Sequence, residues 1–211
     1  MPTTTAHPCP PLADPALIAE FRIAPVAVIS DNLHRLPGAS GLLPQHKGGV
    51  MVGTALTVKT RPGDNLAIHK ALDLVQPGHV LVVDGGGDLS RALIGEIICA
   101  IAQSRGAAGI VIDGAIRDVA TIRAGDFPCF ARGINHLGPY KDGPGHINVP
   151  VTVGGLVVQP GDIVVGDDDG VTAFPQAGAA ELLQAVRQQE QREAEILASI
   201  REGRYVGAYA K

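Results

Sequence analysis

The stretch HVLVVDGGGDLSRALIGEIICAIAQSRGAAGIVIDGAIRD, residues 79–118, contains the pattern from which the architecture follows. Residues 79–84 and 109–114 are two short apolar runs, as expected of strands that are buried on both faces. Between them, the spacing of residues 90–104 predicts a helix that ends before Gly106. Because a strand, a helix and a second strand follow one another, we expect a layered α/β core with partly parallel strands.

The segments on either side continue this alternation and end in a long helix. Working outward, we expect strands at 48–60 and 128–132, helices at 65–75 and 118–124, one or two short helices within 15–36, short strands within 149–174, and a helix at 176–202. The chain then divides into a flexible N-terminal arm (1–14), an α/β core (15–175), and a C-terminal helix with its tail (176–211).

Composition and charge exclude several classes of protein. Of the 211 residues, 45% are apolar and only 3% are aromatic, so the core must be built from Val, Ile, Leu and Ala. The net charge is −4 and no two Lys or Arg residues are adjacent, which argues against nucleic-acid binding. No secretory signal and no apolar run of the ~20 residues that span a bilayer is visible. We therefore expect a cytoplasmic protein without a membrane partner, whose three cysteines are reduced thiols.

Two places in the sequence combine glycines with charged residues. The turn Asp84-Gly85-Gly86-Gly87-Asp88 leads on to Gly95-Glu96-Ile97-Ile98. Glycines after a strand and at the start of a helix let backbone N–H groups approach an anion closely. The spacing matches neither the dinucleotide fingerprint nor a P-loop, and a simple tight turn is the alternative.

The second place is Asp113–Asp118, directly after a predicted strand, where ligands of open α/β sheets collect. Arg117 offers a planar fork that suits a carboxylate, and Asp118 offers oxygen to a hard cation such as Mg²⁺. A surface ion pair is the alternative, and the residues alone slightly favour it.

Residues 87–118 resemble the signature of the RraA-like family of 4-hydroxy-4-methyl-2-oxoglutarate aldolases, a glycine-led helix followed farther along by Arg-Asp. The similarity continues through Phe127–Gly133, Asn148–Val151 and Pro160–Val171, and covers residues 20–203. The resemblance implies a compact α/β/α, swivelling-domain-like fold with a long C-terminal helix. It also implies a homotrimer or homohexamer with sites between subunits.

The resemblance also assigns roles to individual residues. The backbone amides of Gly95, Glu96, Ile97 and Ile98 and the side chain of Arg117 would hold the pyruvyl part of a small 2-oxo acid. Asp118 would bind a divalent metal cation, Mg²⁺ or Mn²⁺, partly through water. The implied activity is cleavage of a 4-hydroxy-2-oxo acid, of the 4-hydroxy-4-methyl-2-oxoglutarate or 4-carboxy-4-hydroxy-2-oxoadipate type from aromatic-compound degradation, to release pyruvate.

The chemistry of this reaction favours a metal over a Schiff base. Cleavage leaves an electron pair on C3 of pyruvate, and that charge is stabilised either by a lysine imine or by a Lewis acid on the 2-oxo oxygen. None of the five lysines lies on the signature. Because loss of CO₂ from oxaloacetate gives the same enolate, we expect oxaloacetate decarboxylation as a side activity.

The predicted C-terminal helix carries one more candidate. At about 100° per residue, Glu193 falls on the stripe of Leu182, Val186, Leu197 and Ile200, whereas Glu195 points away. A carboxylate on an apolar face needs a partner, either a salt bridge across a helix interface or a polar site. By the resemblance, an acidic residue of a neighbouring subunit's C-terminal helix lies near the metal-bound water, with Glu193 the first choice and Glu195 the second.

Other interpretations stay open at this stage. One branch of the same family regulates a ribonuclease by protein contact without catalysis, and it also carries Arg-Asp. A methyltransferase is disfavoured, because no glycine loop of the S-adenosylmethionine type is visible. His34, His69, His79, His136 and His146 lack zinc spacing, and we interpret each as a surface or loop residue. The sequence identifies neither the acceptor half of the substrate nor the native metal.

Overall fold

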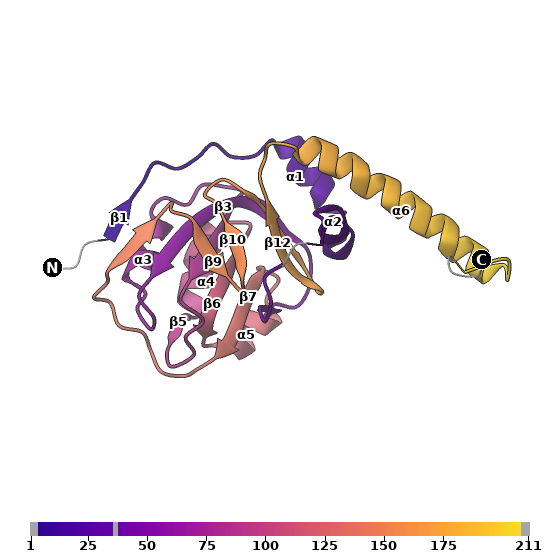
Figure 1. The fold of residues 1–211 in the computed structure, drawn as a ribbon. Coiled ribbons are helices and arrows are strands. Elements are labelled where there is room, and N and C mark those ends of the chain that lie inside the picture. The colour runs from indigo at the N-terminus through magenta and orange to yellow at the C-terminus, as the bar shows by residue number, and fades with distance from the viewer. Residues whose placement is uncertain (1–3, 36–37, 208–211) are drawn as a thin grey trace.

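The structure is a computed structural model that describes residues 4–35 and 38–207 (Figure 1). Its elements in chain order are β1 (Thr4–Ala6), α1 (Pro15–Phe21), α2 (Val26–Asn32), β2 (Leu43–Pro44), β3 (Met51–Thr60), α3 (Leu66–Leu72), β4 (His79–Asp84), β5 (Ala92–Ile94), α4 (Glu96–Ser104), β6 (Gly109–Ile116), α5 (Val119–Ala124), β7 (Cys129–Ile134), β8 (Gly145–Ile147), β9 (Val151–Val153), β10 (Leu156–Val158), β11 (Ile163–Asp167), β12 (Gly170–Phe174) and α6 (Ala179–Arg201). The α/β class and the long C-terminal helix are confirmed.

The centre of the molecule is a parallel sheet of β3, β4, β6 and β7, as the stretch 79–118 predicts. Successive residues of β4 point to opposite faces: Leu81 and Val83 pack into the cluster under α3 and α4, while Val80 and Val82 pack against the other side. Both faces are buried, which explains why β4 is a continuous apolar run.

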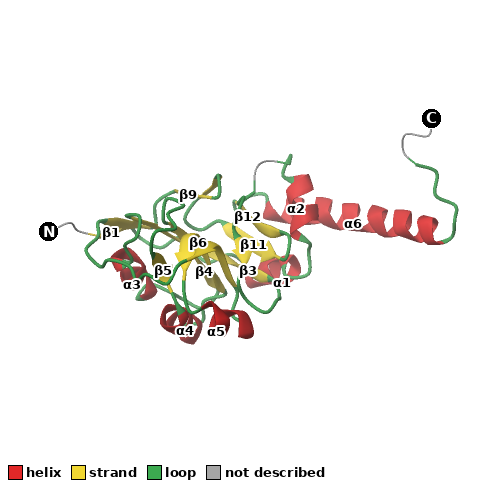
Figure 2. Cartoon of the chain, turned by 90° about the horizontal axis from the view of Figure 1, so that it is seen from below, coloured by secondary structure: helices red, strands yellow, loops and turns green. Residues whose placement is uncertain are grey.

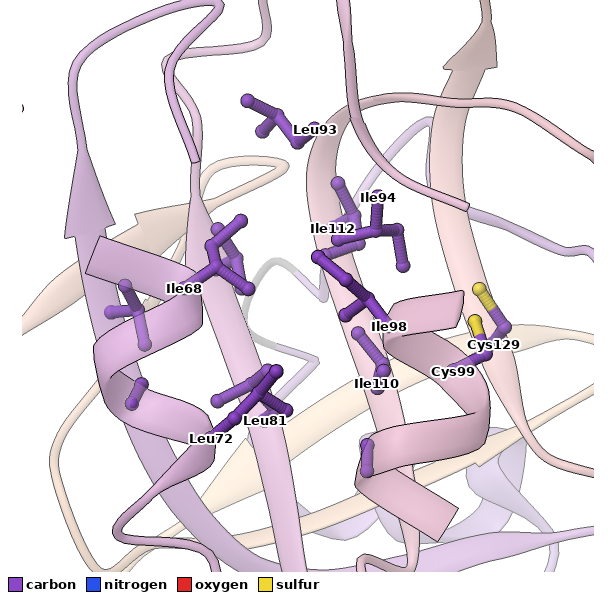
Figure 3. Packing of buried hydrophobic residues seen from close by; sticks show 14 of the residues in the cluster. Ile68, Leu72, Leu81, Leu93, Ile94, Ile98, Cys99, Ile110, Ile112 and Cys129 are labelled. Atoms are coloured by element: carbon purple, nitrogen blue, oxygen red, sulfur yellow. The ribbon is translucent and has the colours of Figure 1, made fainter. Parts of the chain in front are cut away.

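Helices α3, α4 and α5 cover one face of this sheet (Figure 2). Figure 3 shows Ile68 and Leu72 on α3, with Leu72 next to Leu81 of β4, and Ile98 on α4, next to Ile110 of β6. The opposite face is covered by the hairpins β9–β10 and β11–β12, so a further layer of strands lies between the sheet and the remaining helices.

The long strand β3 joins the two layers of strands. Its first part, Met51–Thr54, pairs antiparallel with β11, and its later part, Thr54–Lys59, pairs parallel with β4. Helices α1 and α2 and the first turns of α6 pack on the β11–β12 side through Phe21, Ile29 and Val186. The body of the domain is therefore closed on both sides by helices.

The second half of α6 projects away from this body (Figures 1 and 2). Ala179, Leu183 and Val186 of its first half are buried, but Ile196, Leu197 and Ile200 are 43%, 50% and 49% exposed. The apolar stripe of α6, which the sequence predicts to lie on a packed face, is thus covered by the rest of the chain only in the first half of the helix. In the described part of the chain, no helix is both long enough and apolar enough to cross a membrane.

Two expectations differ from the structure. Residues 90–104 do not form one helix, because Ala92–Ile94 pair with Ala115 and Ile116 of β6 and the helix begins only at Glu96. Within the segment expected to be a loose arm, Thr4–Ala6 pair with β8, and Ala13 is buried with its N–H donated to Thr54 Oγ1 at 2.9 Å. Residues 1–3 of that segment lie outside the described residues.

Candidate functional site

A cavity of about 130 Å³ opens where α3, the start of α4 and the start of α5 meet. It is small compared with the few hundred Å³ of pockets that hold drug-sized ligands. Its walls come from four segments of the chain: Asn65 and His69 at α3, the run Leu93–Gly95 with Ile97 and Ile98 at α4, Arg117 and Asp118 before α5, and Pro139 and Lys141 in the loop that precedes β8. A cavity of this volume can hold a small carboxylic acid.

Asp118 is held in an uncommon conformation at the edge of this cavity. Its φ of 57° places a non-glycine residue in the left-handed region, where Asp is tolerated better than most residues. Its Oδ2 accepts a hydrogen bond from the backbone N–H of Glu96 at 3.1 Å, and Arg117 Nε lies 3.9 Å from the same oxygen. The strained backbone therefore fixes a carboxylate and a guanidinium beside the start of α4.

Gly95 is required by this geometry. A Cβ at position 95 would overlap Asp118 Oδ2 and lie 3.1 Å from Arg117 Cγ. Gly95 is also the N-cap of α4, a nine-residue helix whose first amides have no side-chain cap from Gly95 itself. The amides of Ile97 and Ile98 thus belong to a helix N-terminus that lines the cavity, which is a favourable place for an anion.

The loop between β7 and β8 is anchored over the cavity by two ionised side chains. Asp64, whose side chain is fully buried, accepts hydrogen bonds from the N–H groups of Asp142 and Gly143 at 2.8 and 2.9 Å. Arg91 donates to the carbonyl of Gly138 at 2.7 Å and lies 4.1 Å from the Tyr140 ring centroid. These contacts hold Pro139 and Lys141 against α3.

The electrostatics of Asp64 support this anchoring. Burial raises the pKa of Asp64, but the hydrogen bonds from Leu66, Asp142 and Gly143 and the charge of Arg61 together bring the pKa below its usual value. Asp64 is therefore a carboxylate at neutral pH, and its role is to shape the loop.

The α3 wall of the cavity holds two polar atoms that have no partner among the described residues. Asn65 Oδ1 and His69 Nε2 are both buried without a hydrogen bond. Burial and the neighbouring Lys141 lower the pKa of His69, so its imidazole is neutral at neutral pH. His69 is half-buried on α3 and not in a loop, and it lines the cavity together with Lys141.

The structure brings most of the predicted site residues together. Gly95, Ile97, Ile98, Arg117 and Asp118 all line this one cavity, and the amide of Glu96 is bonded to Asp118. The sequence did not predict Asn65, His69 and Lys141 as site residues, because they lie far from the Arg-Asp motif along the chain. Lys141 reaches α3 only because its loop is anchored over the cavity.

The first glycine turn is a structural turn. The N–H groups of Gly85 and Gly87 both donate to the carbonyl of Asp113, at 3.2 and 3.1 Å. Asp113 is itself engaged, with Oδ1 2.5 Å from Arg132 Nε and Oδ2 accepting from the Gly154 N–H at 2.8 Å. The turn at 84–88 thus ties β4 to β6 and leaves ligand binding to the second glycine, at position 95.

Glu193 is not brought to this cavity within one chain. Its Oε1 accepts from Gln189 Nε2 at 2.9 Å, and it lines a shallow surface hollow between α6 and α2. Glu195 is likewise exposed and accepts from Gln191 at 2.8 Å. Both residues lie on the half of α6 that projects from the body (Figure 1), so either could reach Asp118 only in another copy of the chain.

The residues at the cavity suit a hard divalent cation that is held by few protein ligands. Asp118 provides one carboxylate at the cavity, whereas the exposed side chain of Glu96, whose N–H is bonded to Asp118, lines a separate hollow with Cys99 and Thr121. The described residues contain no group of three or more His, Cys, Asp or Glu arranged to hold a metal. This donor set suits Mg²⁺, which keeps several waters and is held by one or two carboxylates together with substrate oxygens.

Comparisons with known proteins agree with this picture. Residues 26–173 match the family model described as RraA-like, Aldolase/RraA. A protein of Halalkalibacterium halodurans, named "Putative 4-hydroxy-4-methyl-2-oxoglutarate aldolase", is 41% identical over 82% of this chain and 83% of its own length.

Two solved structures are similar over nearly the whole chain. An uncharacterized protein from Pseudomonas syringae pv. tomato has a TM-score of 0.81 at 30% identity, over 92% of this chain and 96% of that one. Streptomyces coelicolor RraAS2, described as an unusual member of the RNase ES inhibitor RraA protein family, has a TM-score of 0.79 at 31% identity, over 89% and 97%.

Proposed function

This chain belongs to the RraA-like family, and we propose that it is a divalent-metal-dependent aldolase that cleaves 4-hydroxy-2-oxo acids to release pyruvate. The substrates we propose are of the 4-hydroxy-4-methyl-2-oxoglutarate or 4-carboxy-4-hydroxy-2-oxoadipate type, with oxaloacetate decarboxylation as a side activity. The similarity to a relative named as such an aldolase supports the reaction class.

One observation carries the proposal: Arg117, Asp118 and the N-terminus of α4 converge on a single small cavity. A 2-oxo acid needs an anion site for its carboxylate and positive charge at its 2-oxo oxygen. The amides of Ile97 and Ile98 meet the first need, and the Arg117 guanidinium, 44% exposed at the cavity, meets the second. Asp118, oriented by the Glu96 N–H, is left to bind the metal.

The chain's residues then have defined roles in bond cleavage. The C4 hydroxyl loses its proton to a base, C4 becomes a carbonyl, and the C3–C4 electron pair moves to C3 and onto the 2-oxo oxygen as an enolate. Arg117 stabilises that enolate oxygen by charge and hydrogen bonding. A Mg²⁺ held by Asp118 would supply Lewis acidity to the 2-oxo group. Protonation of C3 completes pyruvate, and the cavity orients the acid through the α4 amides.

The proposal includes an oligomer in which α6 of one copy contributes to the site of another. We propose that Glu193 of a second copy completes the site in a homotrimer or homohexamer, where its carboxylate would act on water held at the site, with Glu195 as the second choice. The exposed apolar residues Ile196, Leu197 and Ile200 on the projecting half of α6 support such packing, because a helix that is apolar on one side is stable when that side is covered.

A non-catalytic regulator of ribonuclease activity is the alternative function. The similarity to Streptomyces coelicolor RraAS2 favours it. The two functions differ in what the cavity does, since a regulator that acts by protein contact needs no turnover there.

The test is pyruvate release from 4-hydroxy-4-methyl-2-oxoglutarate and from oxaloacetate, with Mg²⁺ and with EDTA. Asp118→Asn is the sharpest variant, because Asn tolerates the left-handed backbone and keeps an acceptor for the Glu96 N–H while it removes the charge. We expect turnover that EDTA abolishes and that falls about a hundredfold or more in Asp118→Asn. Asp126→Asn, an exposed acid after α5, is the matched control and should keep its activity.

Two results would redirect the proposal. Absence of turnover on both acids, from folded protein with Mg²⁺ or Mn²⁺, would favour the regulator. Turnover that survives EDTA would favour a Schiff base, for which Lys141 is the lysine at the cavity. Borohydride reduction in the presence of pyruvate, read by intact mass, separates this case because only an imine leaves a covalent adduct.

A further inference from the structure

Two of the three cysteines form a pair between α4 and β7. Cys99 lies in the first half of α4, Cys129 is the first residue of β7, and Figure 3 shows their sulfur atoms next to each other. The two side chains are hydrogen-bonded to one another, and both are free thiols. The proposed reaction uses neither of them, so the pair has no role in cleavage.

One member of this pair can be reached from outside the protein. Cys99 is 8% exposed and lines a hollow of about 190 Å³ between α4 and α5, together with Glu96 and Thr121, whereas Cys129 is fully buried. A water molecule occupies about 30 Å³ in the liquid, so the hollow has room for an oxidant as small as hydrogen peroxide. Such an oxidant therefore meets the sulfur of Cys99 first.

The hydrogen bond within the pair gives the two thiols different reactivity. It lowers the pKa of Cys99, because a thiolate there accepts the S–H of Cys129, and this outweighs the opposing effects of burial and of the Asp118 charge. The same bond, together with burial, raises the pKa of Cys129 well above its usual value. Since the thiolate is the nucleophile in thiol oxidation, Cys99 is the member that attacks first.

We infer that Cys99 and Cys129 are an oxidation site, which hydrogen peroxide closes to a disulfide that inactivates the cavity at the start of α4. The Cys99 sulfur first attacks one oxygen of the peroxide, the O–O bond breaks, and Cys99 becomes a sulfenic acid as water leaves. The Cys129 sulfur then attacks that of Cys99, the S–O bond breaks, and a second water leaves. Two thiols are oxidised to one disulfide, and one peroxide is reduced to two waters.

Formation of this bond should move α4 more than β7. A disulfide brings its sulfur atoms to about 2 Å, which is closer than two unbonded sulfur atoms can approach. Cys129 is held within the sheet, where it pairs with Ile110 of β6, and its carbonyl accepts the N–H of Gln45 at 2.7 Å. Helix α4 packs on that sheet through side chains such as Ile98. The helix is therefore the element that gives way.

The first turn of α4 has little room for such a shift. The Cys99 N–H is bonded to the Gly95 carbonyl at 3.2 Å, and the Glu96 N–H is bonded to Asp118 Oδ2 at 3.1 Å. Even a methyl group at position 95 would overlap that carboxylate. Oxidation should therefore displace the α4 amides from Asp118 and Arg117 and lower the activity. This effect rests on the proposed function, whereas formation of the disulfide does not.

The experiment measures the disulfide and the activity separately. The protein is treated with hydrogen peroxide, the peroxide is removed, and one portion is unfolded and alkylated with iodoacetamide for intact mass. The reduced chain should take up three alkyl groups, one for each free cysteine, and the oxidised chain should take up one, at Cys9. Pyruvate release with Mg²⁺ by the other portion should fall about tenfold or more, as expected for a displaced site, and dithiothreitol should reverse both changes.

Variants assign the two steps to the two sulfur atoms. Cys129→Ala should stop at the sulfenic acid of Cys99, which dimedone labels, because no second thiol resolves it. Cys99→Ala should leave Cys129 unreacted and should keep its activity after peroxide treatment. Cys9→Ala is the matched control and should lose and regain activity as the wild type does, since burial raises the pKa of the Cys9 thiol and makes it a poor nucleophile.

Three free thiols after peroxide treatment, or a disulfide that includes Cys9, would overturn the inference. A disulfide between Cys99 and Cys129 that leaves pyruvate release unchanged would overturn the effect on the cavity, and so would a loss of activity that persists in Cys99→Ala. A wild type that forms this disulfide but releases no pyruvate even when reduced would refute the proposed reaction and leave the oxidation site standing.

Discussion

The cavity at the start of α4 and the projecting half of α6 differ in how far a single chain completes them. At the cavity, Gly95, Arg117 and Asp118 are fixed by hydrogen bonds and by contacts that leave no room for a methyl group. On α6, Ile196, Leu197 and Glu193 are exposed, and Glu193 accepts a hydrogen bond from Gln189 of its own helix. The first region is organised before any partner arrives, whereas the second gains a role only when another molecule covers it.

Some properties of the molecule therefore belong to a single chain, and others belong only to an assembly of chains. Binding of a 2-oxo acid and a metal can be tested on the body of one chain. The proposed part for Glu193 requires assembly, so variants on α6 should affect activity either by breaking the contact between copies or by changing what one copy contributes to the site of another.

The largest effect is expected from Gly95→Ala. The added Cβ would overlap Asp118 Oδ2 and crowd Arg117, so both residues must shift. We expect pyruvate release to fall about a hundredfold or more, since small displacements at a site are that costly. Gly125→Ala is the control, because a Cβ there would meet its nearest atom, the Ile122 carbonyl oxygen, at an ordinary 3.6 Å. Full activity in Gly95→Ala would show that the site does not depend on this geometry.

The next effect concerns assembly. Leu197→Asp places a charge on the exposed apolar side of α6 and should dissociate the proposed oligomer, with loss of most activity. Light scattering coupled to gel filtration measures the mass. Gln188→Asp serves as the control, because at about 100° per residue it lies on the opposite side of the helix. A wild type that is monomeric at assay concentrations and fully active would contradict a role for α6 in the site.

A smaller effect distinguishes the two acids on α6. Glu193→Gln should lower kcat about tenfold without a change of oligomeric mass, if its carboxylate acts on the metal-bound water. Glu195→Gln should leave kcat nearly unchanged. Steady-state assays of both variants at saturating Mg²⁺ decide between them, and the opposite pattern would transfer the role to Glu195.

The smallest effect is on stability. Asp64→Asn sets an amide against the N–H groups of Asp142 and Gly143 and should cost about 1–3 kcal/mol of unfolding free energy. The folded-state pKa of Asp64 is lowered, so its contribution is complete above the unfolded value of about 3.9 and is lost as the pH falls through the folded value. Urea unfolding at several pH values should therefore show the two proteins converging only in acid. A constant difference at every pH would refute this role.

Much of the body could be predicted from the sequence because its signals are local. The apolar run 79–84 is β4 within the same bounds, and the helix expected at 176–202 is α6, Ala179–Arg201. Residues 92–94 were misread, because a three-residue apolar run is a strand or part of a helix according to its neighbours, and only pairing with β6 decides it.

The site was predictable in part for a related reason. Gly95 and Asp118 lie on the recognisable signature, and the structure places them in one cavity with Arg117. His69 and Lys141 are ordinary residues of a short helix and a loop, and their place in the cavity depends on the buried Asp64 that anchors the loop. A long-range arrangement of this kind leaves no periodic trace in the sequence.

The most direct test of the central claim follows the enolate itself. Proton NMR in D₂O measures the exchange of the methyl protons of pyruvate, which requires the enolate but no bond cleavage and no particular acceptor half. We predict exchange by the wild type with Mg²⁺ that EDTA abolishes and that Asp118→Asn largely loses. Folded wild type that catalyses no exchange with Mg²⁺ or Mn²⁺, or exchange that persists in Asp118→Asn, would contradict the assignment of this cavity as a metal-dependent aldolase site.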